Sequence, residues 1–192
     1  MRQNGRQAGF TLVELMIVVA VMGIVIASMP IARGYLPEVR VNGFTRSLAM
    51  EMREARALAV EYGNDVIVAF DLDNSVVNVY SDSDSDGMEL ADLIRSRPFS
   101  YYGNGVAIRA VSSTGVDGAL LSSSIHLGST SDPVYVTFRS NGSAENVGAI
   151  YLAPSDSAKI ELGRAIEVLS TGRITMWKFS LSGSPGPWVK WL

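Results

Sequence analysis

The 192-residue chain has no cysteine and a single histidine, His126. Without cysteine there can be no disulfide framework, thiolate metal site, cysteine nucleophile or lipid-bearing cysteine anchor. One histidine excludes a histidine-based triad and a multi-histidine metal site. His126 lies in a Ser/Gly-rich stretch, where a packed or solvated role is expected. Glycine-rich phosphate loops and the G-x-S-x-G and S-x-x-K motifs of hydrolases are also missing, so the sequence does not indicate an enzyme.

Charge is also scarce, because only 18% of the residues are charged and the formal net charge is −3. No cluster of lysine and arginine reaches the length of a nucleic-acid footprint, so DNA or RNA binding is not expected. Hydrophobic residues make up 47% of the chain and are concentrated near the N-terminus. The length suits one domain with a proper core rather than two.

The N-terminal segment combines a short basic stretch with a long apolar run. Residues Met1–Gly9 are polar and carry Arg2 and Arg6, and the following twenty residues, Phe10–Met29, contain one charge, Glu14. A helix of that length spans about 30 Å, the thickness of the hydrocarbon core of a membrane. Arg2 and Arg6 lie in the short segment before the apolar run, and positive residues there orient the N-terminus toward the cytoplasm. The sequence thus predicts a single-pass membrane protein whose remaining chain lies outside the cytoplasm.

Glu14 is the anomaly in this run. An ionisable group inside a membrane segment costs roughly 2.5–3.5 kcal/mol and usually has a partner. A cleaved secretory signal has a shorter apolar region of about 7–15 residues without a carboxylate. An ordinary signal peptide or plain anchor is therefore the weaker interpretation.

The string Gly9-Phe10-Thr11-Leu12-Val13-Glu14 resembles the type IV prepilin signature. The resemblance implies that a prepilin peptidase cuts after Gly9 and methylates the new N-terminus at Phe10. It also implies that Glu14, fifth from that end, neutralises the α-amine of a neighbouring subunit in a filament. A buried carboxylate is costly unless paired, so such a pair favours one axial register. The implied partners are the peptidase, other pilins or pseudopilins, the inner-membrane assembly platform and membrane lipid.

A long helix is expected from about Thr11 to Tyr62, weakened where prolines and a glycine follow the apolar run, at Pro30, Gly34 and Pro37. The domains expected along the chain are a leader at 1–9, a transmembrane helix at 10–32, its amphipathic continuation at 33–63 and a head at 64–192. One helix face is apolar: Val41, Phe44, Leu48, Met52, Ala55, Ala59 and Tyr62. The opposite face carries Arg46, Glu51, Arg53, Glu54 and Glu61. Gly63-Asn64 is a helix stop.

Beyond Asn64 short β-type runs alternate with turn residues. The expected strands are Val66–Phe70, Val76–Tyr80, Val106–Val111, Val134–Arg139, Val147–Leu152, Ala165–Leu169 and Ile174–Phe179. Asn141-Gly142 predicts a hairpin between the fourth and fifth strands, and Thr171-Gly172 separates the last two. Ser112–Thr130 is expected to be a loop with a weak strand at Leu120–Leu127. The fold class is α+β, a long helix packed on an antiparallel all-β head, which is the arrangement of the type IV pilin fold.

The segment Val134–Phe179 carries a second resemblance. It contains YVTFRSNGSAENVGAIYLA and RAIEVLSTGRITMWKF. These are similar to the closing hairpins of the minor-pilin family shared by type II secretion pseudopilin H (GspH) and the FimT and FimU pilins, with a Phe-x-x-x-Gly turn and a Thr-Gly-Arg turn. The resemblance implies a subunit present in few copies, at or near the filament tip.

An acidic segment gives D-x-D-x-D-G through Asp82, Asp84, Asp86 and Gly87, the first half of a calcium loop. The twelfth position, which needs a bidentate carboxylate, is Leu93. Asp92 and Glu89 lie close by, so a calcium site formed by the three aspartates and Asp92 needs another loop geometry. The alternative is an acidic, flexible hairpin tip.

The tail contains Pro185, Pro187, Trp188 and Trp191. Its tryptophans either fold back on the sheet, the more common outcome, or form a sticky surface for another subunit. The function expected overall is that of a minor pilin or pseudopilin. A type IV pilus and a type II secretion pseudopilus both remain open, and the rival of another class is a membrane-anchored periplasmic binding module that enters no filament.

Overall fold

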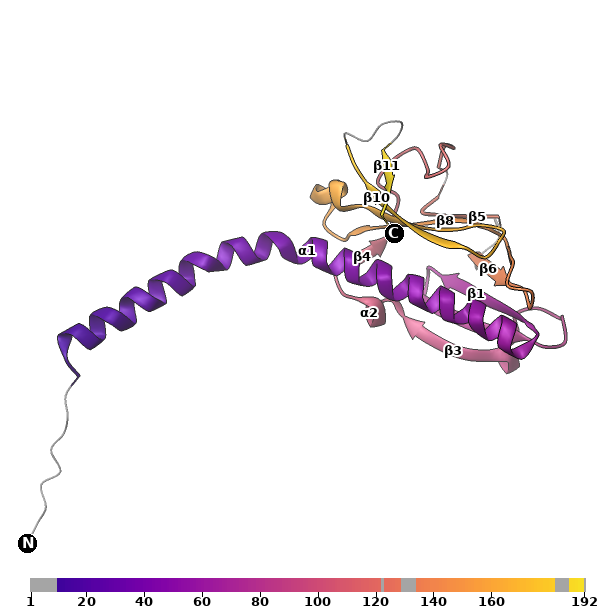
Figure 1. Cartoon of the computed structure of the whole chain (residues 1–192), viewed down its shortest axis with the longest axis horizontal. Helices are drawn as coiled ribbons and strands as arrows, with labels where there is room; N and C mark the ends of the chain where they lie inside the picture. Colours follow the sequence, from indigo (N-terminus) through magenta and orange to yellow (C-terminus); the bar gives the residue numbers. More distant parts are fainter. Residues whose placement is uncertain (1–9, 122, 129–133, 182–186, 192) are drawn as a thin grey trace, which may run out of the picture. The chain divides into compact units, whose positions relative to one another are not determined.

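The computed structural model describes residues 10–121, 123–128, 134–181 and 187–191, without the side chains of 27–34, 157 and 158. The chain divides into two compact units, Met1–Leu36 and Pro37–Leu192. The expected leader at residues 1–9, including Gly9, lies outside the described residues. Helix α1, Leu12–Tyr62, continues from the first unit into the second (Figure 1).

In the first unit, every residue from Phe10 to Ile26 is exposed. The large apolar side chains among them show between 47% of their surface, at Val18, and 82%, at Phe10. The hydrophobic residues that the sequence concentrates here are therefore exposed in the first unit.

No helix among the residues described in full is long and apolar enough to cross a membrane. The expected transmembrane helix at 10–32 includes residues 27–32, whose side chains lie outside that description. The span stays a prediction.

In the second unit, α1 presents the predicted apolar face to the core. The buried members of that face are Val41, Phe44, Leu48, Met52, Ala55 and Ala59. The helix is continuous through Pro30, Gly34 and Pro37 and ends at Tyr62. Gly63 then takes a positive φ of 71°, and its N–H donates to Ala59 O over 3.1 Å, so the predicted stop is confirmed.

Two predictions about the faces of this helix are wrong. Tyr62, which was predicted to lie on the apolar face, is 52% exposed. Periodicity shows on which side of a helix a residue lies, but it does not show where along the helix the contact with the sheets ends. Glu51, placed on the polar face, is only 3% exposed. Strand β3, Leu93–Pro98, covers that flank of the helix with Arg95 and Arg97, whose side chains pair with Glu51.

The head consists of two antiparallel sheets. The first has five strands in the order β3-β2-β1-β6-β7, and the second has six, in the order β11-β10-β9-β8-β4 with β5 also paired to β8. Besides β3, the strands of the first sheet are β1 Asp65–Asp71, β2 Val76–Asp82, β6 Val134–Phe138 and β7 Ala144–Glu145. Those of the second are β4 Val106–Ile108, β5 Ile125–Leu127, β8 Gly148–Pro154, β9 Arg164–Val168, β10 Ile174–Phe179 and β11 Trp188–Lys190. Short helical turns are η1 Leu90–Asp92, α2 Phe99–Tyr102 and η2 Ser157–Leu162.

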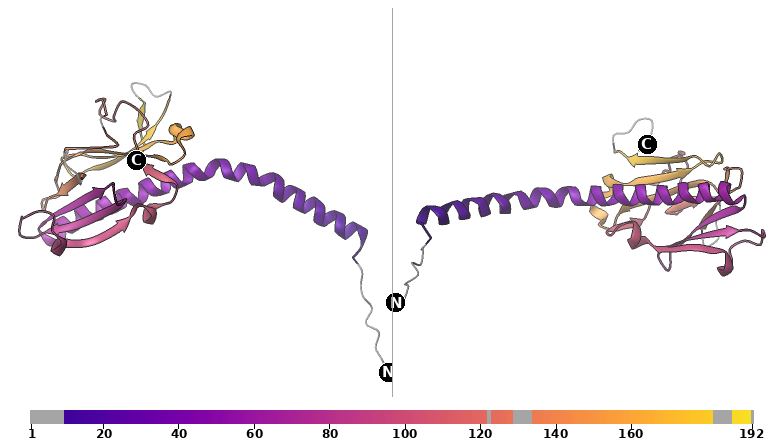
Figure 2. Two further views of the ribbon diagram at one scale, coloured as in Figure 1. Left: turned by 180° about the vertical axis from the view of Figure 1, so that it is seen from behind. Right: turned by 60° about the horizontal axis from the view of Figure 1, so that its bottom comes forward.

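The main core lies where the second half of α1 meets both sheets (Figures 1 and 2). It joins helix residues such as Phe44 and Leu48 to Val68 of β1 and Ile150 of β8. A smaller cluster contains Tyr151, Phe179 and Trp188, against which partly buried residues of the segment 110–121 pack.

Six of the seven predicted strands are confirmed to within two residues at each end. The exception, Val106–Val111, shortens to β4, because after Arg109 donates to Tyr151 O the segment leaves the sheet. The weak strand at Leu120–Leu127 is confirmed only as β5. The Asn141-Gly142 hairpin exists, but it joins β6 to the short β7 rather than to β8, which belongs to the other sheet.

The tail folds back on the head, as expected. Strand β11 pairs with β10, with Trp188 opposite Phe179. Trp188 is 7% exposed, and Trp191 lies beneath the guanidinium groups of Arg46 and Arg164. A sticky surface formed by both tryptophans is therefore the wrong alternative.

Candidate functional site

The start of α1 is fixed by Thr11. Its hydroxyl accepts a hydrogen bond from the Glu14 N–H over 3.2 Å, which satisfies one of the amide donors that the first helical turn leaves free. Thr11 and Glu14 have the spacing of a capping box, in which a glutamate at the third helical position supports the cap. The residues of the prepilin-like string thus build a defined helix start directly behind Phe10.

Glu14 projects from this first turn into solvent. Within the described part of the chain its carboxylate forms no ion pair, and the positive end of the helix dipole favours a negative charge there. Phe10 is also exposed, whereas Gly9 lies outside the described residues. Two of the three residues predicted for processing and assembly therefore lie within one turn of the helix start and are open to other molecules.

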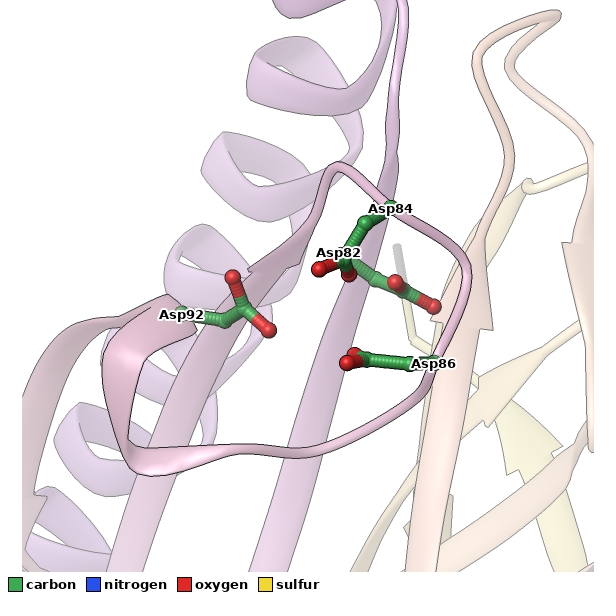
Figure 3. A group of neighbouring side chains, drawn as sticks. All are labelled: Asp82, Asp84, Asp86 and Asp92. Carbon is green, nitrogen blue, oxygen red and sulfur yellow. The ribbon is translucent and has the colours of Figure 1, made fainter.

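The four predicted calcium ligands come together at one end of the first sheet. Asp82 ends β2, Asp84 and Asp86 lie in the following loop, and Asp92 precedes β3. One carboxylate oxygen from each lies within 4.8 Å of the others (Figure 3). Gly87 has a φ of +108°, which explains the glycine at this turn.

The electrostatics of this aspartate cluster are unfavourable without a cation. The side-chain hydrogen bond with Asp84, desolvation and the charges of Asp84, Glu89 and Asp92 raise the pKa of Asp86 to about 6. Asp82 Oδ1 is buried and has no hydrogen-bond partner among the described residues. Carboxylate oxygens are preferred Ca²⁺ ligands, so the residues fit such an ion through Asp92 instead of the twelfth loop position.

A charge network centred on buried Glu51 lies between α1 and β3, and it was not predicted from the sequence. Glu51 Oε1 accepts from Arg95 at 2.9 Å, and its other oxygen accepts from Arg97. Arg95 also donates to Glu54 at 2.8 Å, and Arg97 lies over the Tyr101 ring, with 4.3 Å to its centroid. A signal was present in retrospect, because Arg95 and Arg97 alternate on one strand face opposite a helix rich in glutamate.

The two turns of the second resemblance also meet in space. Arg56 of α1 donates to Gly142 O at 2.7 Å and to Thr171 O at 3.2 Å. A Cβ on Gly172 would lie 2.1 Å from Gly142 O, so the turns touch through their backbones. The helix thereby holds the β6–β7 and β9–β10 hairpins together.

Comparison with known proteins gives one match. A model of the prokaryotic N-terminal methylation motif matches residues 4–29, which include Phe10, Thr11 and Glu14. No curated protein and no solved structure matches the chain. The match supports a type IV prepilin-like protein that is processed by prepilin peptidase and assembles with other pilins. The helix and antiparallel sheets fit an α+β, pilin-like fold.

Proposed function

We propose that this prepilin-like protein is a minor pilin or pseudopilin, a structural subunit of a type IV pilus or a type II secretion pseudopilus. The observation that carries the proposal is the methylation motif at residues 4–29, with Glu14 exposed in the first turn of a helix whose apolar residues are uncovered. Cleavage after Gly9 would leave the α-amine of Phe10 beside the helix start. In this proposal the subunit is held in the inner membrane before it is assembled into the filament. The alternative function is that of a membrane-anchored periplasmic binding module that enters no filament.

In this proposal the exposed apolar surface of Phe10–Ile26 lies first in lipid and then against the helices of neighbouring subunits. Inside that environment an unpaired carboxylate is costly. Glu14 therefore favours the one axial position in which it meets the N-methylated amine of a neighbour. The pairing of Glu14 with that amine needs a free N-terminus at Phe10, so in this proposal leader removal precedes assembly.

Charge and helix capping are separable at this site. Glu14→Gln keeps a side chain that can support the cap but removes the charge. Thr11→Val removes the hydroxyl that accepts the Glu14 N–H and leaves the charge in place, at a cost of about 1 kcal/mol of helix stability. We expect both variants to lose the leader and reach the membrane normally. Only Glu14→Gln should be missing from sheared filaments or the purified assembly complex.

Recovery of Glu14→Gln at the wild-type level would show that the charge has no part in assembly. Loss of leader removal in this variant would instead assign Glu14 to recognition by the peptidase. If only Thr11→Val were missing from the filaments, assembly would depend on the structure of the helix start and not on the charge of Glu14.

The proposed relation to pseudopilin H and the FimT and FimU pilins, and with it a place at or near the tip, rests on the sequence resemblance of the two turns. Phe138 is fully buried, and Gly142 and Gly172 have φ of +79° and +72°. The residues of the Phe-x-x-x-Gly and Thr-Gly-Arg patterns thus have structural reasons for their identity. Arg56 joins the two turns.

We also propose that the aspartate cluster of Asp82, Asp84, Asp86 and Asp92 binds calcium. The specific observation is that the four carboxylates converge within 4.8 Å, with Asp82 Oδ1 buried and unpartnered. A divalent cation would offset the mutual repulsion that raises the pKa of Asp86. The ion would hold the β2–β3 loop and tie β3 to β2.

Calcium at millimolar concentration should raise the melting temperature of the full-length protein in detergent by mass action, and Asp84→Ala should abolish that shift. Without calcium, protonated Asp86 contributes to the free energy of unfolding, because its pKa is higher in the folded protein than its ordinary value of 3.8. That stabilisation is complete below pH 3.8 and is lost as the pH rises through about 6. Asp86→Asn should therefore melt higher than wild type at pH 7.5 and lose most of the calcium response.

The matched control is Asp73→Asn, which removes the same charge from the turn at the other end of the β1–β2 hairpin. It should respond to calcium as the wild type does. An unchanged wild-type melting temperature at millimolar calcium would leave the acidic, flexible loop as the correct interpretation.

A further inference from the structure

A pocket of about 710 Å³ opens on the head, apart from Glu14 and from the aspartate cluster. Its walls include Trp177 of β10, Trp188 of β11, Pro187 and the loop 114–118. Pockets of this size accommodate small ligands or the side chains of a partner. The pocket adjoins the smaller aromatic cluster, where Trp188 contacts Tyr151 and Phe179 with 5.3 Å between ring centroids in each pair.

The loop that forms one wall is held by hydrogen bonds. Trp188 Nε1 donates to Thr114 O at 2.9 Å, and the Val116 N–H donates to the Tyr151 hydroxyl at 3.1 Å. A Cβ on Gly115 would lie 2.7 Å from that same hydroxyl, so the backbone approaches the aromatic cluster as closely as a glycine permits. The wall is therefore fixed before any ligand arrives, which lowers the entropic cost of binding.

Both indole N–H groups at the pocket are already used. Trp177 Nε1 donates to Glu167 Oε2 at 2.9 Å, and Trp188 donates to the loop. What remains for a ligand is accessible ring surface, chiefly that of Trp177 because Trp188 is only 7% exposed, and the π-electrons of such a ring attract cations. The two indoles cannot donate hydrogen bonds to an anion or to a carbonyl oxygen.

The charge of the pocket has one sign. Asp117 is the only charged residue among the described residues that line it, and Glu167 lies behind Trp177. Burial is the main reason that the pKa of Tyr151 is raised to about 12, and the negative charges of Asp117 and Glu167 act in the same direction. Two carboxylates, those of Asp117 and Glu167, thus lie near the aromatic residues of the pocket.

Elsewhere in the head, guanidinium groups cover aromatic rings. Arg46 and Arg164 lie 5.1 and 5.3 Å from the centroid of Trp191, and Arg97 lies over Tyr101. Among the described residues, no arginine or lysine lies over Trp177 or Trp188. Within the described chain their ring faces therefore have no cation contact, although Lys190 is paired opposite Trp177 across β10 and β11.

We propose that this pocket binds an organic cation, a guanidinium or alkylammonium group, with Trp177 and Trp188 as the aromatic surface and Asp117 as the counter-charge. Cation–π attraction at partly desolvated sites and a carboxylate at the rim both favour such a ligand. A neutral saccharide would use the ring surface but not the charge of Asp117. None of the described residues that line the pocket lies on α1.

The proposal is tested with the full-length protein in detergent, labelled with ¹⁵N-tryptophan. Its three tryptophans give three indole N–H signals. Titration with N-acetyl-arginine amide should shift the signals of Trp177 and Trp188 and leave that of Trp191 in place. The neutral analogue N-acetyl-citrulline amide, of nearly the same shape, should bind about tenfold more weakly.

Asp117→Asn retains an oxygen that can accept the Ala119 N–H, which Asp117 Oδ1 accepts at 3.1 Å, so the loop should keep its form. It should weaken arginine amide binding about two- to fivefold, the effect of an exposed ion pair. Asp73→Asn, with the same loss of charge outside the pocket, should bind as the wild type does.

Equal binding of the citrulline and arginine amides, or maltose binding in place of both, would overturn the proposal. An unchanged affinity in Asp117→Asn would do the same. A capped Gly-Gly-Arg-Gly-Gly peptide distinguishes the sources of the cation. Tighter binding of the peptide than of arginine amide indicates a partner polypeptide, and equal binding indicates a small molecule.

Discussion

Glu51 and Glu54 lie one turn apart on α1 and share Arg95, yet solvent reaches them very differently. The Glu51 side chain is 3% exposed and that of Glu54 is 49% exposed. Hydrogen bonding to Arg95 is the main cause that lowers the pKa of Glu54 from its ordinary value. In an exposed ion pair such attraction adds little to the stability of the fold. A buried carboxylate that loses its partners is strongly destabilising, because its charge is left without compensation.

Glu51→Ala should therefore lower the free energy of unfolding of the head by about 2–3 kcal/mol, because Arg95 and Arg97 lose their buried acceptor. The matched variant Glu54→Ala should cost less than about 1 kcal/mol. Urea denaturation followed by tryptophan fluorescence measures both values. Equal losses would mean that the depth of burial does not determine the contribution of these ion pairs.

The position of Glu51 shows where residue patterns lose their predictive value. Periodicity identified the apolar face of α1 because hydrophobic side chains repeat at helical spacing. Glu51 borders that face, and its burial depends on β3, a strand that the sequence analysis did not recognise. Whether a charged residue at the border is exposed is decided by a partner element far away in the sequence.

At the scale of elements, the strands with continuous β-branched and aromatic residues were predictable. Apolar and polar residues alternate in a strand of which one face is buried, and a strand that is buried on both faces is apolar throughout. Strand β3 reads Leu-Ile-Arg-Ser-Arg-Pro, and its polar residues gave no strand signal because its arginines are paired with the helix. Strands β7 and β11 are two and three residues long, too short for a pattern.

Turn residues were predictable for a related reason. Gly63, Gly142 and Gly172 all adopt positive φ, which disfavours other residues. The sequence could not reveal that the turns at Gly142 and Gly172 touch, nor that Arg56 binds both. That contact joins residues from three separate parts of the chain.

Substitution at Gly172 tests the contact between the turns. Gly172→Ala must keep a φ near +72° and would bring its Cβ to 2.1 Å from Gly142 O and 2.6 Å from Arg56 Nε. The free energy of unfolding should fall by about 3 kcal/mol, of which about 1–2 kcal/mol is the left-handed conformation. The matched control Gly63→Ala has a φ of +71° and no atom within 4 Å, so it should lose only the conformational part. A similar loss in both variants would exclude a close contact.

At the scale of the whole molecule, the chain contains two units, of which one has a core of its own and the other exposes its apolar residues. The head has its own core, formed by the second half of α1 and two sheets. The apolar residues of Phe10–Ile26, which belong to the first unit, are exposed and need a cover. A lipid bilayer or neighbouring helices would supply it, and the motif at residues 4–29 suggests a membrane-anchored type IV pilin.

The central claim is that this chain is a prepilin whose functional N-terminus is made by cleavage. The mass of the N-terminal peptide of the protein extracted from bacterial membranes tests it most directly. We predict a peptide that begins with N-methyl-Phe10, so that Arg2 and Arg6 are lost with the leader. A mature chain that begins at Met1, or one cut beyond Pro30, would contradict the account.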